Sequence, residues 1–229
     1  MPEEEERHTR IGFQGDRGNL MTETGWAEAS LDLGLKHAER LIDLVDFCVS
    51  RAGLKPADLD LIACSGGPGS FTGLRIGMAT AKGLSLALKK PWASVPTLDC
   101  LAWGFESYQG VVAPAMDGKK GRFYTAFYLK GARISDYLDI SLARFASLVD
   151  TYPQTLITGP DAALFEELAS QRSGIHIDRR AGASAARALA VLAAEKFAKE
   201  GPSANDEGPL YLRPSEAEEA ASNGGSSSS

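Results

Sequence analysis

Apolar positions along the chain recur with two different periods. In Leu31–Ala52 they follow the i, i+3, i+4, i+7 spacing of an amphipathic helix, and Gly53 stands where that helix would end. A second helix is predicted over Thr72–Lys89. Between them, Leu59–Ser65 is a short apolar run, which is typical of a buried strand. Because strands and helices alternate, the pattern predicts an α/β protein with three layers.

The remaining segments continue this alternation. Two short strands are predicted before the first helix, with the turn GDRGN between them. Residues 111–129 predict a hairpin with a polar turn at Asp117–Arg122 and an aromatic second arm. Helical patterns follow on both sides of a strand predicted at residues 155–159. The end of the chain, SNGGSSSS, has the composition of a flexible tail.

Charge and cysteine content narrow the class of protein. The 229 residues carry 24 Lys and Arg against 30 Asp and Glu, a net charge of −6. Such a chain is poorly suited to bind nucleic-acid phosphates by itself, so we expect any RNA contact to be indirect, through another protein. Three cysteines without a C-x-x-C pair argue against a disulfide framework, and no apolar run approaches the length of a membrane span. We therefore expect a cytoplasmic protein.

Residues 64–88, CSGGPGSFTGLRIGMATAKGLSLAL, place six glycines around the start of the second predicted helix. The stretch matches neither the Walker A loop nor G-x-G-x-x-G. A helix that begins after such a turn is favourable for anions in general, and Arg75 opposes the helix dipole in the first turn. Two interpretations of Arg75 stay open, a contact with an anionic ligand and a pair with a surface carboxylate.

The same helix has a face of small residues. They recur every four positions at Gly73, Gly77, Ala81 and Ser85. Because glycine inside a helix is about 1 kcal/mol less favourable than alanine, this face indicates the close approach of another element. Spacing alone leaves open whether that element is the chain's own sheet or another chain.

Residues with catalytic chemistry are scattered. The histidines His8, His37 and His176 form no H-x-x-x-H or H-E-x-x-H motif, and Ser70 does not stand in G-x-S-x-G. We expect no catalytic residue, no metal site and no bound cofactor, and we interpret His37 as a structural or interface residue. The turn Asp117–Arg122 is either a solvated turn or a minor RNA contact.

The run GGPGSFTGLRIGMATAKGLSLAL resembles the signature of the TsaB family, also called YeaZ, the smaller relatives of the TsaD and Kae1 proteins. Further segments resemble the family in the same order: KHAERLIDLVDFCVSRAGLKPADLDLIA, with His37 at the family's recurrent histidine, then VPTLDCLAW, AMDGKKGRFYTAFY and PLYLRP. The resemblance covers about residues 35–213.

This resemblance implies an α/β fold of the actin-like ATPase (ASKHA, ribonuclease H-like) class with two βα lobes. We expect an N-terminal lobe at residues 1–103, a C-terminal lobe at 104–215 and a disordered tail at 216–229. Family members open with an apolar strand and an Asp-Thr-Ser-like loop, whereas this chain has only MPEEEERHTRIGFQGDRG before the helix. The first strand is therefore expected to be missing or divergent, which argues against nucleotide binding. If the start is misplaced, the reading frame upstream of Met1 should encode the strand.

The resemblance also implies a function. TsaB-like chains are non-catalytic scaffold subunits that pair with a TsaD-like catalytic subunit and a TsaE-like P-loop ATPase, or with themselves. The complex forms N6-threonylcarbamoyladenosine at adenosine 37 of tRNAs that read codons beginning with A, so we expect no activity from this chain alone. The alternative is an M22-type glycoprotease-like hydrolase, against which the missing metal and nucleophile motifs argue.

By the same resemblance, the partner contact lies on the two helices predicted at residues 31–52 and 72–89. The interface residues are expected to be His37, Leu41, Leu44, Phe47, Arg75, Gly77, Met78 and Ala81.

Overall fold

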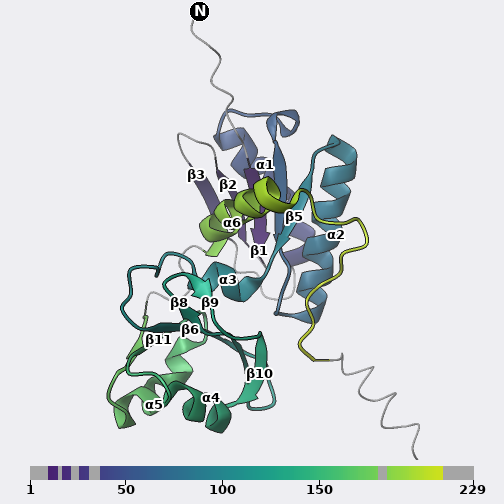
Figure 1. The fold of residues 1–229 in the computed structure, drawn as a ribbon. Coiled ribbons are helices and arrows are strands. Elements are labelled where there is room, and N and C mark those ends of the chain that lie inside the picture. Colours follow the sequence, from purple (N-terminus) through teal and green to yellow (C-terminus); the bar gives the residue numbers. More distant parts are fainter. Residues whose placement is uncertain (1–9, 15–16, 22–25, 31–36, 180–184, 214–229) are drawn as a thin grey trace, which may run out of the picture.

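Two β-sheets, one above the other in Figure 1, form the framework of the chain. The computed structural model describes residues 10–14, 17–21, 26–30, 37–179 and 185–213. The strands of the first sheet stand in the order β3 (Trp26–Ser30), β2 (Arg17–Met21), β1 (Arg10–Gln14), β4 (Leu61–Ser65) and β5 (Trp92–Val95). β1 pairs antiparallel with β2 and parallel with β4, and β4 pairs parallel with β5.

The strand expected to be missing or divergent has a counterpart here. β1 lies beside β4, with Arg10 opposite Leu61 and Phe13 opposite Cys64. A strand that departs from the family's sequence pattern therefore occupies the central position of the first sheet. The two residues that join it to β2 lie outside the described part of the chain.

Helices cover both faces of the first sheet. On one face, α1 (His37–Arg51) and α2 (Phe71–Leu88) pack on Ile62 and Cys64 of β4. On the other face, α3 (Thr97–Ala102) and α6 (Ala185–Glu200) pack on Leu61 and Ala63. Because β4 is buried on both sides, its sequence is an apolar run without alternation.

The second sheet lies below the first in Figure 1. Its main path has the order β10 (Leu138–Ser141), β7 (Arg122–Thr125), β6 (Val111–Asp117), β11 (Thr155–Thr158) and β12 (Ile175–Ile177). β8 (Tyr128–Leu129) pairs with β6 and with β9 (Ala132–Arg133). Three further helices accompany it: α4 (Leu142–Val149), the 3-10 helix η3 (Ala162–Phe165) and α5 (Glu166–Gln171). Phe145 and Phe165, with ring centroids 4.5 Å apart, lie in the core of this part.

Most predicted elements are present. The second predicted helix agrees with α2 to within one residue at each end, and the Ser70 hydroxyl accepts the Gly73 N–H at its start. The described part of the first helix begins at His37, so its predicted start lies outside the described residues, as does the tail. The aromatic arm of the hairpin is interrupted between β7 and β8, because the Phe127 N–H donates to the Ser135 hydroxyl. The short strands β10 and β12 and the two-residue β9 were not predicted.

The chain passes twice between the sheets. After β5 it crosses through α3 to β6, and after β12 it returns, so that α6 packs on the first sheet although it follows the second in sequence. The predicted lobe boundaries at residues 103 and 215 stay predictions. Within the described ranges, no helix is long and apolar enough to cross a membrane.

Candidate functional site

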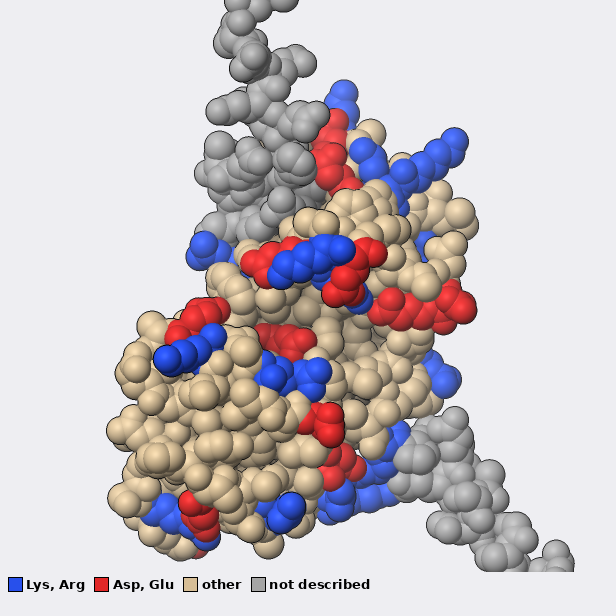
Figure 2. Space-filling model, viewed as in Figure 1, with Lys and Arg blue, Asp and Glu red and all other residues tan. Residues whose placement is uncertain are grey.

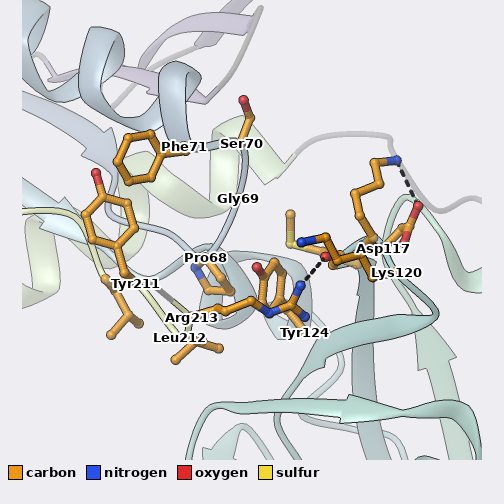
Figure 3. A pocket seen from close by; sticks show the side chains of 14 residues that line it. Pro68, Gly69, Ser70, Phe71, Asp117, Lys120, Tyr124, Tyr211, Leu212 and Arg213 are labelled. Carbon is orange, nitrogen blue, oxygen red and sulfur yellow. Dashed lines mark hydrogen bonds and ion pairs between the residues drawn. The ribbon is translucent and has the colours of Figure 1, made fainter. Parts of the chain in front are cut away.

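A cleft of about 430 Å³ lies between the glycine loop and the second sheet. Three segments line it: residues 68–71 of the glycine loop, residues 116–120 and Tyr124 of the β6–β7 hairpin, and residues 210–213 near the end of the chain. Figure 3 shows these segments facing one another across the cleft. This is the place where the glycine stretch meets residues that are distant in sequence.

The first glycines of the loop serve the packing of the chain itself. A Cβ at Gly66 would lie 2.3 Å from the Ser94 hydroxyl oxygen, so β5 approaches too closely for a side chain. Gly67 has a φ of +100°, and a Cβ there would lie 2.8 Å from the Leu210 carbonyl oxygen. The Leu210 N–H donates to the Gly66 carbonyl at 2.7 Å. These two glycines therefore let residue 210 and β5 pack against the loop.

Arg75 packs against two aromatic rings of the chain itself. Its guanidinium carbon lies 3.9 Å from the centroid of the Phe71 ring, and its Nε donates to the Tyr211 hydroxyl at 3.0 Å. The Phe71 and Tyr211 rings stack with centroids 4.8 Å apart. In the described structure Arg75 thus stacks on aromatic rings and does not pair with a surface carboxylate, and its contact with an anionic ligand stays a prediction.

The turn at the tip of the β6–β7 hairpin is organised by Asp117. Its carboxylate accepts the Lys119 backbone N–H and the Lys119 ammonium, both at 2.8 Å. The side-chain hydrogen bond from Lys119 is the main reason why the pKa of Asp117 is lowered. Lys119, Lys120 and Gly121 all have a positive φ, a conformation that side chains rarely adopt. The Lys119 ammonium is thus held within its own turn.

The predicted interface residues divide into two groups. Leu41, Met78 and Ala81 lie in the core under α1 and α2, and Leu44 is buried as well. Phe47 is 49% exposed, Arg75 is exposed, and Gly77 is half-buried. His37 is the first residue of α1, and its side chain lies outside the described part. Their role in an interface stays a prediction, but only the second group can reach another molecule without unpacking the core.

The outer surface of α1 and α2 includes three exposed large apolar side chains among polar ones. Ile42, Phe47 and Leu86 are 50%, 49% and 83% exposed. A Cβ at Gly77 or Gly83 would meet no atom within 4 Å. These two glycines are therefore not required by the packing of the described chain, unlike Gly66 and Gly67.

Two cysteines and Ser70, whose side chains could act as nucleophiles, have other environments in the described structure. Burial is the main cause that raises the pKa of Cys64, to about 12, and it raises the pKa of Cys100 as well, so both thiols are protonated at neutral pH. Ser70 caps α2. Among the described residues, no three His, Cys, Asp or Glu side chains come together as a metal site.

Charged side chains of both signs are interspersed on the face drawn in Figure 2. A continuous basic stripe, the usual footprint of a nucleic-acid groove, does not cover this face.

Sequence reasoning did not single out two groups of residues that link distant segments. Tyr211 and Arg213 line the cleft from the end of the chain. Asp99 of α3 accepts hydrogen bonds from the hydroxyls of Tyr128 and Tyr137 at 2.5 and 2.8 Å. The only local signal was the segment PLYLRP, which is apolar within an otherwise polar end of the chain.

The chain is similar to known proteins over most of its length. A family model described as "TsaD: tRNA N6-adenosine threonylcarbamoyltransferase" matches residues 33–221. The protein "tRNA threonylcarbamoyladenosine biosynthesis protein TsaB" of Bacillus subtilis (strain 168) is 34% identical over 109 residues, 48% of each chain. The protein of the same name from Escherichia coli (strain K12) is 36% identical over 95 residues, 41% of each chain. The chain thus matches about half the length of these curated relatives, or less.

Solved structures are similar to this chain over a larger share of its length than the curated relatives are. YeaZ from Pseudomonas aeruginosa superimposes with a TM-score of 0.74 at 25% identity, over 90% of this chain and 100% of that one. An inorganic polyphosphate/ATP-glucomannokinase from Arthrobacter sp. strain KM has a TM-score of 0.51 at 11% identity, over 83% of this chain and 99% of that one, which concerns the fold alone. The predicted actin-like α/β fold is confirmed.

Proposed function

The chain belongs to the TsaD family as a protein of the TsaB (YeaZ) type, and from this membership we propose that it is a scaffold subunit in tRNA modification. The complex it serves forms N6-threonylcarbamoyladenosine at position 37 of tRNAs that read A-starting codons. In it, a TsaD-like subunit carries out catalysis and a TsaE-like P-loop ATPase assists. This chain contributes binding surface and no reacting group, and it meets tRNA through the complex.

The observation that carries this proposal is the extent of the YeaZ likeness, which includes the whole of that chain. The curated relatives support it with their names, both of which refer to threonylcarbamoyladenosine biosynthesis. The hydrolase alternative is less favoured, because the matching family model describes a tRNA-modifying transferase.

The surface that we propose for the TsaD-like partner is the outer side of α1 and α2. It combines the exposed apolar side chains of Ile42, Phe47 and Leu86 with glycines that the described chain does not need, Gly77 and Gly83. Apolar surface supplies the main driving force for association, and small residues let a second helix approach closely. A second copy of this chain is the alternative occupant of the same surface, as a homodimer.

Reconstitution from purified components tests the proposal. Unmodified tRNA is incubated with a TsaD-like and a TsaE-like protein of the same organism, with and without this chain, and digested tRNA is analysed for the modified nucleoside by mass spectrometry. We expect modification only when all three proteins are present, and none with this chain alone. Modification that does not depend on this chain would contradict the scaffold role, and activity of the chain alone would contradict its non-catalytic character.

A further inference from the structure

The residues that follow α6 form a strap, which we define as Ser203–Arg213. Its beginning is bound to the first sheet, because the Ser203 N–H donates to the Trp92 carbonyl at 2.9 Å and its hydroxyl accepts the Ser94 N–H at 3.0 Å. The strap then runs along α2, where the Lys82 ammonium donates to the carbonyls of Asn205 and Glu207 at 2.8 and 2.6 Å. The first half of the strap is thus held by β5 and α2, which both belong to the part of the molecule around the first sheet.

The middle of the strap reaches the glycine loop. The Leu210 N–H donates to the Gly66 carbonyl at 2.7 Å. One residue later, Tyr211 stacks on Phe71 and accepts a hydrogen bond from Arg75. Backbone and side chain both fix the strap here, on the side of the cleft that belongs to the first sheet.

The last residue of the strap binds the opposite side of the cleft. Arg213 forms a two-pronged contact with Asp139 of β10, from Nε to Oδ2 and from Nη2 to Oδ1, each at 2.9 Å. Its Nη1 also donates to the Gly118 carbonyl at 3.3 Å, a contact drawn as a dashed line in Figure 3. The Arg213 and Asp139 side chains are only 17% and 10% exposed. A bidentate charge-assisted pair shielded from water is among the stronger polar contacts in proteins.

The strap therefore bridges the two halves of the molecule across the cleft, and residues 210–213 form one of the cleft's walls. A second connection lies elsewhere, at α3, where Asp99 binds Tyr128 and Tyr137. The hollow lined by Asp99 shares no residue with the cleft. The two halves of the molecule are thus joined at two separate places, by α3 at one and by the contact between Arg213 and Asp139 at the other. In a protein whose halves rotate, the first connection corresponds to a hinge and the second to a latch.

We propose that the strap is a latch between the two sheets, fastened by Arg213 and Asp139, whose release opens the cleft by rotation about α3. The inference concerns the isolated chain and does not depend on the proposed assembly. It assigns Arg213 a task that Arg122 does not share, although the Arg122 Nε also donates to Asp139, at 2.9 Å. Arg122 and Asp139 both belong to the second sheet, so their contact stays within one side of the cleft.

Distance measurements between spin labels test the latch. The three native cysteines are buried, so labels attach at cysteines introduced on exposed positions of α1 and α4, by Ser50→Cys and Ser147→Cys. In the Arg213→Gln variant we expect the distance distribution to shift to longer values and to broaden. The Arg122→Gln variant, which loses an Asp139 contact without touching the strap, should keep the parent distribution. Far-UV circular dichroism verifies that each variant is folded.

Lys82→Met gives an independent version of the test, because it removes the ammonium group that holds residues 205 and 207 to α2 while leaving the Asp139 contacts intact. We expect longer label distances and faster hydrogen exchange at the Leu210 amide in this variant, as in Arg213→Gln. The latch is refuted if a folded Arg213→Gln variant keeps the parent distance distribution, or if Arg122→Gln shifts it equally. Should Arg213→Gln not fold, unchanged distances and unchanged Leu210 exchange in Lys82→Met overturn the proposal in its place.

Discussion

Replacing Gly77 and Gly83 by alanine should make the isolated chain more stable. Both glycines lie inside α2, and a Cβ at either would meet no atom within 4 Å. Alanine is about 1 kcal/mol more favourable than glycine in an exposed helix interior. Six positions along a helix correspond to about 9 Å, far enough for the two effects to add. The double variant should therefore gain about 2 kcal/mol, and its Tm should rise by roughly 4–8 °C for a chain of this size.

The same substitutions should weaken binding to the TsaD-like partner if α2 is the contact surface. Extra methyl groups in a close-packed helix seam cost about 1–3 kcal/mol, and each 1.4 kcal/mol raises Kd about tenfold. Ala79→Leu adds more bulk to the exposed side of α2, and Ala198→Leu adds the same bulk to an exposed position of α6 on the opposite face of the sheet. We expect weaker binding from the first change and unchanged binding from the second.

Urea unfolding and calorimetric titration with the partner measure the two quantities. A double glycine variant that is less stable than the parent would mean that the helix needs these glycines for its own packing. A double variant that gains stability and binds with the parent's affinity would remove α2 from the interface. Either result would refute the argument that the glycines are kept for a neighbouring molecule.

Three more changes have defined outcomes. Ala81→Glu places a carboxylate in the core under α1 and α2, so it should lower the free energy of unfolding by about 3–5 kcal/mol in urea titrations of the isolated chain; a stable variant would contradict this packing. Because burial raises the pKa of Cys64 to about 12 and all three cysteines are buried, Ellman's reagent at pH 8 should titrate no thiol until denaturant is added. The lowered pKa of Asp117 is due first to the Lys119 side chain, so Lys119→Met should raise that pKa toward 3.8 in an NMR titration. The contribution of this contact to stability is present above the unfolded-state pKa and is lost as pH falls through the lowered one, and the variant should lack this acid-dependent loss.

Local sequence signals predicted where α2 begins and ends, but they did not predict which of its faces is buried against the sheet. Periodicity and the glycine run are properties of neighbouring residues, so the ends of the helix were predicted to within one residue. The same periodicity says which residues share a face but not which face meets the sheet. Met78 and Ala81, which the resemblance placed in a partner contact, pack in the chain's own core, and their place in an interface stays a prediction. Which face of a helix is buried depends on the elements that pack against it, and the sequence of the helix alone does not specify these.

The contacts of the strap and the short strands could not be predicted from neighbouring residues either. Arg75 and Tyr211 are separated by 136 positions, and Arg213 and Asp139 by 74. No window of sequence contains both partners of such a contact. β10 and β12, with the sequences LDIS and IHI, alternate apolar and polar residues, but they are only four and three residues long, so the alternation is too brief to stand out as a strand.

The return of α6 to the first sheet has a consequence for the order in which the protein is made. Leu61, Ala63 and Val95 leave the ribosome long before the helix that covers them, because the whole second sheet is synthesised in between. During that interval one face of the first sheet is uncovered apolar surface, a condition that favours aggregation or chaperone binding. The second sheet, whose strands and covering helices are contiguous in sequence, completes its core first. A nascent chain stalled before residue 185 should therefore resist protease in its second half and be cleaved in its first.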